Sequence, residues 1–247
     1  MPGISRRRFV QASAAASLLP AAQAAPSILI LIADDMNPDL GCYGHGIVHT
    51  PNLDRLAAAG VRFSRAFVTS PQCSPSRSSM FTGRYPHANG CSRLHAPLPA
   101  HEASIVELLG ARGYYTGAFR KHHLGSHFQR RFHFYGDARQ PWNAFLDRLP
   151  AGRPFFLWAG FTDPHRPYQK GAFSPPHEPA QVRAPSYLPD TPVVREDLAL
   201  YYDEIARMDR ECGELLGELE KRGLAGNTLV FFTADNGKPF PRAKCTL

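Results

Sequence analysis

A short polar stretch, Cys73-Ser74-Pro75-Ser76-Arg77, combines a thiol and a cation at a spacing that suits anion chemistry. Pro75 predicts the start of a helix, because proline is favoured at the first helical position, and Cys73 would then lie at its N-terminus. Free backbone N–H groups and the helix dipole favour an anion there. Arg77 follows about one turn later and can fold back towards the same point. A lone cysteine is more often a small buried apolar residue, but this five-residue pattern favours a chemical role.

Acidic side chains follow two apolar runs near opposite ends of the chain. Asp34 and Asp35 come directly after the first run, and Asp235 and Asn236 come shortly after the last. These four residues offer oxygen ligands, which select Ca²⁺ or Mg²⁺ over zinc. Two adjacent aspartates also repel each other unless a cation neutralises them. The aspartate pair could instead cap a loop, but the matching Asp-Asn-Gly sequence favours a shared cation site.

Basic and imidazole groups follow two further apolar runs. Lys121 and His123 lie just beyond Phe119, and His165 lies just beyond Phe161. Ligands of open α/β sheets bind beyond the carboxyl ends of the strands, so we expect all these groups at one site. His165, which has prolines near it, could instead be a turn residue. Three further histidines are interpreted as loop residues, namely His45, His49 and His122.

The elements that must position these groups alternate between apolar strands and helices. Short apolar runs predict strands over 27–33, 61–68, 114–119, 155–161 and 228–233. Helices are predicted over 51–59, 75–81, 103–111, 142–149 and 196–222, the last from apolar residues at three- and four-residue spacing. The proline-rich stretch 164–195 predicts a long surface excursion. This alternation predicts an α/β fold, with a mostly parallel sheet sandwiched by helices.

Composition narrows the class of ligand. The 247-residue chain has a formal net charge of +7, which suits an anionic substrate. No Lys/Arg run interleaved with aromatics lies outside the N-terminus, so nucleic-acid binding is not expected. The five cysteines contain no Cys-x-x-Cys pair and predict neither a disulfide framework nor a zinc site.

Residues 1–25 predict a twin-arginine signal peptide. The stretch begins with Ser5-Arg6-Arg7-Arg8-Phe9, continues through an Ala/Leu segment, and offers small residues at cleavage-site spacing in Ala22-Gln23-Ala24. The apolar segment is too short and too rich in alanine to form a stable membrane span. Its alternative is a disordered basic N-terminus. The pattern predicts export, after folding in the cytoplasm, to the periplasm or the extracellular space.

Taken together, these motifs resemble the sulfatase family, part of the alkaline-phosphatase-like superfamily. The resemblance runs from about Ser27 to Leu247 and is carried by I-A-D-D, T-P-N-L-D-R-L, C-S-P-S-R with T-G, K-x-H-L-G, D-P-H and T-A-D-N-G. In that family the motif cysteine is oxidised to formylglycine before export, which fits the twin-arginine route. Residues 232–241, with Asp163-Pro164-His165-Arg166, are most similar to the sulfamidase subgroup.

The resemblance implies a role for each matching residue. The ligands of a Ca²⁺ ion would be Asp34, Asp35, Asp235, Asn236 and the formylglycine made from Cys73. The hydrated aldehyde would attack sulfur with one hydroxyl, while Ca²⁺ and Arg77 favour its anion. His123 would assist the second hydroxyl in expelling sulfate. Lys121 and Lys244 would hold sulfate oxygens, and His165 would protonate or hydrogen-bond the leaving oxygen or nitrogen. Spacing alone leaves Lys238 as an alternative to Lys244.

The chain departs from the family pattern at several positions. Arg120 stands where the family often has Gly, and His122 where it often has Trp. Lys244 stands where the sulfamidase likeness suggests Arg. Sulfatases continue past this length into further strands and a smaller C-terminal domain. We therefore expect residues 26–247 to be the N-terminal portion of a sulfatase catalytic domain, with its C-terminal part missing and an exposed sheet edge.

Three functions follow from these observations. The first is hydrolysis of sulfate esters or sulfamates, with a sulfated sugar as substrate and a formylglycine-generating maturation enzyme as partner. The second is hydrolysis of phosphonate or phosphate monoesters, because the same superfamily builds similar pockets for phosphorus. The third is an inactive exported remnant that binds sulfated glycans. Oligomeric state is left open.

Overall fold

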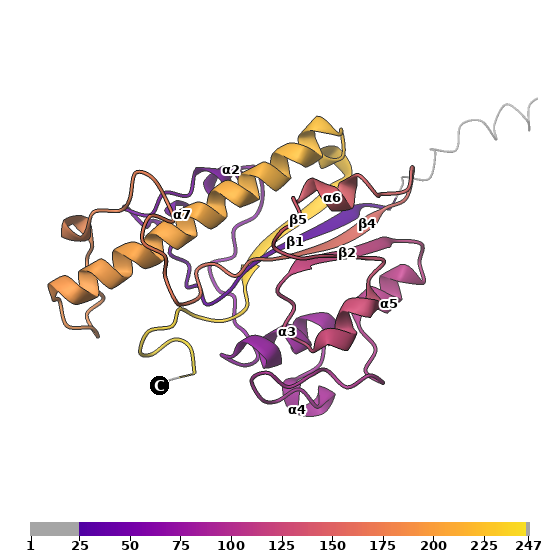
Figure 1. Ribbon diagram of the computed structural model, residues 1–247, viewed down its shortest axis with the longest axis horizontal. Helices are drawn as coiled ribbons and strands as arrows, with labels where there is room; N and C mark the ends of the chain where they lie inside the picture. Colours follow the sequence, from indigo (N-terminus) through magenta and orange to yellow (C-terminus); the bar gives the residue numbers. More distant parts are fainter. Residues whose placement is uncertain (1–24, 246–247) are drawn as a thin grey trace, which may run out of the picture.

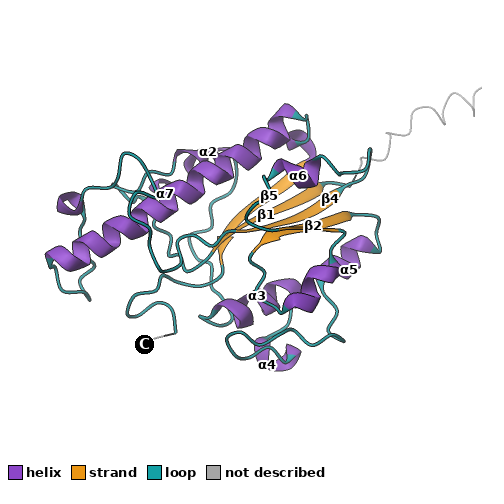
Figure 2. Ribbon diagram, in the orientation of Figure 1, coloured by secondary structure: helices purple, strands orange, loops and turns teal. Residues whose placement is uncertain are grey.

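A five-stranded parallel sheet forms the centre of the molecule (Figure 2). The computed structural model describes residues 25–245, so the predicted signal peptide lies, except for its last residue, outside the described residues. The strand order is β3-β2-β4-β1-β5, and every neighbouring pair is parallel. The strands are β1 (Ser27–Ala33), β2 (Tyr115–Arg120), β3 (Phe134–Gly136), β4 (Phe155–Gly160) and β5 (Thr228–Ala234). The predicted α/β class and parallel sheet are confirmed.

Helices cover both faces of this sheet (Figure 1). One layer contains α2 (Pro51–Ala59), α6 (Asn143–Leu146) and the long α7 (Pro192–Lys221). The other contains α3 (Cys73–Thr82), α4 (Pro86–Asn89) and α5 (Ile105–Gly110). Short 3-10 turns lie at Gly41–Tyr43, Ser126–Arg131, Pro179–Gln181 and Ala225–Asn227. No helix among residues 25–245 has both the length and the apolar character needed to cross a membrane.

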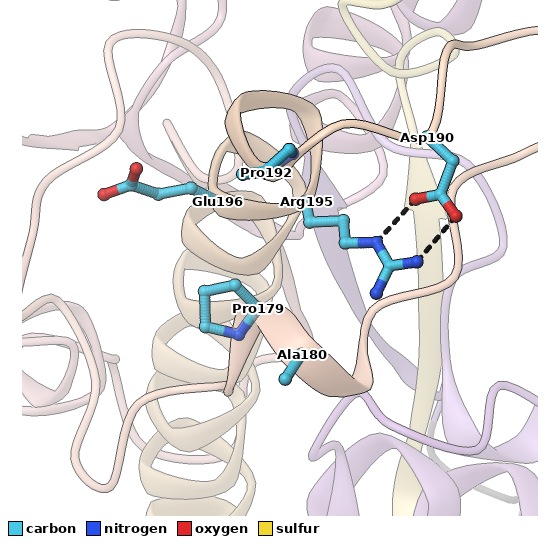
Figure 3. Close-up of a pocket in the computed structure, with 6 residues that line it drawn as sticks. All are labelled: Pro179, Ala180, Asp190, Pro192, Arg195 and Glu196. Carbon is cyan, nitrogen blue, oxygen red and sulfur yellow. Dashed lines mark hydrogen bonds and ion pairs between the residues drawn. The ribbon is translucent and has the colours of Figure 1, made fainter.

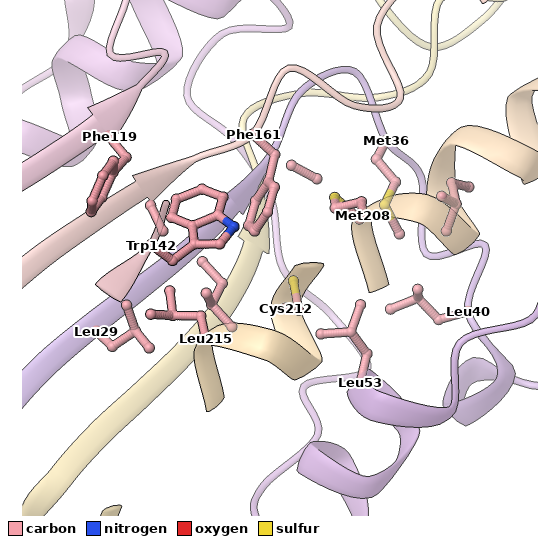
Figure 4. Close-up of a cluster of buried hydrophobic side chains, with 14 of the residues drawn as sticks. Leu29, Met36, Leu40, Leu53, Phe119, Trp142, Phe161, Met208, Cys212 and Leu215 are labelled. Carbon is pink, nitrogen blue, oxygen red and sulfur yellow. The ribbon is translucent and has the colours of Figure 1, made fainter. Parts of the chain in front are cut away.

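Each face of the sheet has its own apolar core, because successive side chains of a strand point to opposite faces. Leu29 of β1 packs on the α7 side in a cluster with Met208 and Leu215 (Figure 4). Ile32 of the same strand belongs to the other cluster, with Phe81 of α3. Burial on both faces explains why β1 and β4 are continuous apolar runs rather than alternating ones.

Two helices begin earlier than the sequence predicts. α7 starts at Pro192 rather than at residue 196, because the Thr191 side chain accepts a hydrogen bond from the backbone N–H of Val194 and proline occupies the first helical position. α3 starts at Cys73 rather than at Pro75. Cys73 is thus the first residue of the helix. The helices predicted over 103–111 and 142–149 are shorter than expected, and the three-residue strand β3 was not predicted.

The strand predicted over 61–68 is wrong. These residues form no strand, and Val61 and Phe67 are 80% and 90% exposed. Their apolar alternation is strand-like, but a strand also needs a neighbour for its backbone groups, and none of the described strands pairs with them. Among the described strands, β5 pairs with β1 alone, and its Leu229 and Phe231 side chains are also exposed. Among residues 25–245, one face of this outermost strand is therefore apolar and exposed.

A carboxylate from α7 caps the N-terminus of helix α2. Asp209 is buried and accepts backbone hydrogen bonds from Asn52 at 3.2 Å and from Leu53 at 2.8 Å. Its carboxylate also accepts the side-chain amide of Asn52 at 2.8 Å. Gly213, one turn further along α7, leaves room for Asn52, because a Cβ atom there would lie 2.4 Å from the Asn52 side-chain oxygen. Asp209 of α7 thus supplies the N-terminal cap of α2 and holds the two helices together.

We predict that Asp209→Ala lowers the free energy of unfolding by about 2 kcal/mol, because two N–H groups of α2 lose a charged acceptor. Urea unfolding followed by circular dichroism measures the change. Glu214→Ala, at an exposed position of the same helix, is the matched control and should cost less than about 0.5 kcal/mol. Equal losses in the two variants would contradict the capping role.

Candidate active site

The register of the sheet brings distant acidic residues together. β1 and β5 pair through Ala33 and Ala234, so Asp34 and Asp235 leave adjacent strands at the same level. The N–H of Asp35 donates to Asp235 Oδ1 at 3.0 Å, and the backbone of Asp35 is in the left-handed region with φ 65°. This left-handed turn brings the Asp35 carboxylate close to the carboxylate of Asp34. All three carboxyl groups are buried.

Cys73 faces these carboxylates from the N-terminus of α3. Its Sγ lies 3.5 Å from Asp34 Oδ1 and 3.6 Å from Asp35 Oδ1. One ligand atom from each of Asp34, Asp35, Cys73 and Asp235 can be chosen so that all four lie within 4.8 Å of one another. The structure therefore joins the two acidic stretches and the cysteine motif in one buried cluster.

Arg77 is fully buried and holds the cluster from one side. Its Nε donates to Asp235 Oδ2 at 2.8 Å, and a terminal nitrogen lies 3.4 Å from Asp34 Oδ1. Its other terminal nitrogen donates to the backbone carbonyl of Lys121 at 2.6 Å. Burial by itself raises the pKa of a carboxyl group, but Arg77 and Lys121 bring the pKa of Asp34 below its usual value. Burial dominates at Asp235, whose pKa is raised.

Further basic side chains surround the same carboxylates. Lys121 Nζ donates to Asp34 Oδ2, and Lys244 Nζ donates to Asp35 Oδ2 at 2.6 Å. His165 Nε2 lies 3.6 Å from Asp35 Oδ2. Lys238, the alternative to Lys244, instead bonds Asp39 at 3.2 Å. The structure thus brings Lys121, Lys244 and His165 to the acidic cluster.

His123 lies beside the cluster in a half-buried position. Burial, followed by the charges of Lys121, His95 and Arg77, lowers the pKa of His123 to about 4, so the ring is neutral at neutral pH. Its Nε2 lies 2.7 Å from Nδ1 of His95. Sequence reasoning missed His95, because it lies in a loop between α4 and α5 and belongs to no motif.

A cavity of about 310 Å³ opens beside Asp34 and Lys121. Its other lining residues are polar or bulky and come from the segment after β4 and from α7: Thr162, Asp163, His165, Arg166, Pro167, Gln169, Glu204 and Arg207. Arg207 donates to Asp163 at 2.7 and 2.8 Å, a pairing that the sequence did not indicate. This cavity gives the cluster access to a polar ligand larger than an ion.

A second hollow, of about 540 Å³, lies at the start of α7 (Figure 3). Its lining includes an ion pair in which Arg195 donates to both carboxylate oxygens of Asp190, at 2.5 and 2.6 Å (Figure 3). None of the acidic cluster lines it. Of the two cavities, the smaller one is the one that Asp34, Lys121 and His165 line.

The donor set of the cluster fits a hard divalent cation. Asn236 donates its amide N–H to Asp35 Oδ1 at 2.8 Å, but its own Oδ1 is buried and has no hydrogen-bond partner among residues 25–245. A buried oxygen without a partner is costly. Three carboxylates and this amide oxygen are the ligands that Ca²⁺ and Mg²⁺ prefer. A cation here would offset the mutual repulsion of the carboxylates.

The Cys73 thiol is a poor nucleophile in this setting. Burial, followed by the negative charges of Asp235 and Asp34, raises its pKa well above the ordinary value. The thiolate is the reactive form of cysteine, so an unmodified Cys73 is held in its inert, protonated form at neutral pH.

Comparisons with known proteins identify the family. The sulfatase family model matches residues 26–244. Human N-sulphoglucosamine sulphohydrolase is 34% identical over 261 residues, which cover 89% of this chain and 52% of that protein. Arylsulfatase A of Bos taurus is 31% identical over 286 residues, which cover 88% and 53%. The chain spans about half the length of the curated relatives it matches. The solved phosphonate monoester hydrolase of Silicibacter pomeroyi shares the fold, with a TM-score of 0.71 at 17% identity, covering 86% of this chain and 62% of that chain.

A buried histidine next to the site predicts a pH-dependent stability. His122 packs against the rings of Phe128 and Tyr135, and burial followed by the charge of Arg77 lowers its pKa to about 4. Its pKa in the unfolded chain is about 6.5, so its contribution is complete above pH 6.5 and is lost as the pH falls towards 4.

The free energy of unfolding should fall on going from pH 7 to pH 4. We predict that this fall is about 3 kcal/mol smaller in His122→Phe, which keeps a ring but cannot titrate, than in wild type. Urea unfolding across this pH range measures the difference. His87→Phe, at an exposed position, should follow the wild-type profile. Parallel profiles for wild type and His122→Phe would refute the shift.

Proposed function

The chain belongs to the sulfatase family, and from this premise we propose that it is the N-terminal catalytic portion of a sulfatase that acts on a sulfated glycan. The reaction would be hydrolysis of a sulfate ester or a sulfamate. The observation that carries the proposal is the position of Cys73, at the first residue of α3 and within 3.6 Å of two buried carboxylates. The likeness to an N-sulphoglucosamine sulphohydrolase supports a sulfated sugar as the substrate class.

A calcium ion would be held by Asp34, Asp35, Asp235 and Asn236, together with the group at position 73. When bound, it would act as a Lewis acid that polarises oxygen and balances developing negative charge. The unpartnered Asn236 Oδ1 supports this assignment. Lys121 and Lys244 offset two of the carboxylates in the structure, so a cation would release both ammonium groups to contact an anionic substrate.

Formylglycine made from Cys73 would supply a hydroxyl nucleophile through its hydrated aldehyde. The inert thiol supports this conversion, because a protonated Cys73 could not perform the attack itself. A formylglycine-generating maturation enzyme would be the partner, and it must reach Cys73 before the site closes around it. Twin-arginine export to the periplasm or the extracellular space, after that modification, fits the predicted signal peptide.

The remaining residues divide the work of binding and proton transfer. Arg77 lies between Asp34 and Asp235, where its fixed charge favours an anion at position 73. Lys121 and Lys244 would bind sulfate oxygens, and His165 would hydrogen-bond or protonate the leaving oxygen or nitrogen. His123 is neutral at neutral pH and would accept the proton whose removal helps to expel sulfate.

Hydrolysis of phosphonate monoesters is the second candidate, favoured by the shared fold with the Silicibacter pomeroyi enzyme. Turnover of nitrophenyl sulfate and of a phenylphosphonate ester by the same matured sample separates the two. We expect the sulfate to be the better substrate. A preference for the phosphonate would contradict the sulfatase proposal and support phosphonate monoester hydrolysis.

We predict that Cys73 carries an aldehyde when the full chain is made in cells that contain the maturation enzyme. Mass spectrometry of the tryptic peptide that contains residue 73 detects it, and the same chain made without that enzyme is the control. Sulfatase activity should follow the aldehyde fraction and be absent from Cys73→Ala. Finding thiol alone in the co-expressed chain would remove the basis of the proposed mechanism.

We predict that the chain binds one Ca²⁺ ion and that Asp35→Asn weakens this binding by about tenfold or more, because one ligand loses its charge. Titration calorimetry on the purified chain gives the dissociation constant. Asp137→Asn, which changes a partly exposed aspartate paired with Arg139 and remote in sequence from the cluster, is the matched control. A chain that binds no calcium would instead support an inactive remnant.

A further inference from the structure

Two histidines from separate parts of the chain meet at the edge of the site. His95 lies in the loop between α4 and α5, and His123 lies just after β2. Nδ1 of His95 and Nε2 of His123 are 2.7 Å apart, and the ring centroids are 4.7 Å apart. At this distance one nitrogen must carry a proton and the other must accept it. The pair is therefore a hydrogen bond between two imidazoles.

The loop that carries His95 is built onto the first turns of α3. The backbone N–H of His95 donates to Ser74 Oγ at 3.0 Å, so His95 is attached to the residue that follows Cys73. Cys91 donates from its sulfur to the Ser74 carbonyl at 3.7 Å and from its N–H to Asn89 Oδ1 at 3.0 Å. Asn89 in turn donates to Ser78 Oγ at 3.0 Å. His95 thus has a fixed position relative to residue 73.

The second nitrogen of the His123 ring has a different environment. His123 Nδ1 is buried and has no hydrogen-bond partner among the described residues. His95, by contrast, is exposed, so its own Nε2 can donate to water. Lys121 and Arg77 contribute positive charge at His123, and each outweighs the opposing contribution of Asp235. A positive field favours a nitrogen lone pair over an N–H at the unpartnered position.

We propose that His95 is a positioning residue for His123. His95 Nδ1 accepts a hydrogen bond from the Nε2–H of His123, which fixes the orientation of the His123 ring, keeps its proton on Nε2 and leaves its Nδ1 unprotonated. Nδ1 is then the nitrogen that accepts a proton during turnover. This assignment rests on the proposed function, in which His123 accepts the proton whose removal expels sulfate. His95 acts through His123 and has no assigned contact with substrate.

Loss of His95 should slow turnover, because His95 orients His123, but should leave substrate binding largely unchanged. Without His95, the His123 ring can rotate and exchange tautomers, and part of the population presents an N–H where a base is needed. Removing a partner that orients a ligand in a metal site reduces activity by about 10–100-fold, and we expect a loss of this order here. Substrate affinity should change little, because Lys121 and Lys244 bind the sulfate independently of His95.

The tautomer can be measured without any activity. Long-range ¹H–¹⁵N correlation spectra of histidine-labelled chain should show His123 protonated at Nε2 and bare at Nδ1. In His95→Ala the His123 signals should shift towards a mixture of tautomers. His95→Asn, whose side-chain oxygen can replace Nδ1 as acceptor, should restore the wild-type pattern. His101→Ala, a change at an exposed histidine outside the site, is the matched control.

Kinetics on the matured chain supply the second measurement. His95→Ala should lower kcat by about 10–100-fold with KM changed by less than about twofold, and His95→Asn should recover most of kcat. A His123 protonated at Nδ1 in wild type, or a spectrum unaffected by His95→Ala, would overturn the proposal. A loss confined to KM would do so as well. A matured chain without sulfatase activity, but with the expected tautomers, would refute the proposed function and leave the histidine pairing supported.

Discussion

Three buried carboxylates in one place are the constraint on which the rest of this structure depends. Asp34, Asp35 and Asp235 are all removed from water, and burying unpaired charges of one sign is strongly unfavourable. Three cations neutralise them: Arg77 from α3, Lys121 just after β2 and Lys244 from the C-terminal segment. Segments far apart in the sequence must therefore meet at the carboxyl ends of the strands. The parallel register of β1 and β5 makes this possible, because it ends both strands at the same level.

The part of the site that could be predicted from the sequence is the part with local or register-based causes. Ser27–Ala33, which is buried on both faces, and Thr228–Ala234, which is exposed on one face, were both recognisable as continuous apolar runs. The carboxyl-end rule then placed their acidic residues together. Cys73 and Arg77 lie about one helical turn apart, so their proximity followed from helix geometry alone. The family resemblance supplied Lys244, whose contact with Asp35 depends on a segment without regular structure.

The features that could not be predicted depend on a tertiary partner. Residues 61–68 have strand-like alternation, but pairing decides whether a strand forms, and the chain gives them none among its described residues. His95 is one histidine among eleven, and only the anchoring of its loop to Ser74 brings it to His123. Arg207 reaches Asp163 from a helix that follows a long irregular excursion. In each case the sequence contains the residue but not the contact.

The formal charges of the cluster differ between the metal-free chain and the proposed calcium-bound enzyme. The formal charges of three carboxylates and of three permanent cations, Arg77, Lys121 and Lys244, cancel without any ion. With this balance the folded chain can bury the cluster without a metal ion. A divalent cation among the carboxylates would leave an excess of positive charge in a site of low dielectric. An anionic sulfate group would offset that excess, so metal binding and substrate binding would favour each other. The same excess would favour an anionic nucleophile at position 73, which a thiol surrounded by carboxylates alone could not become.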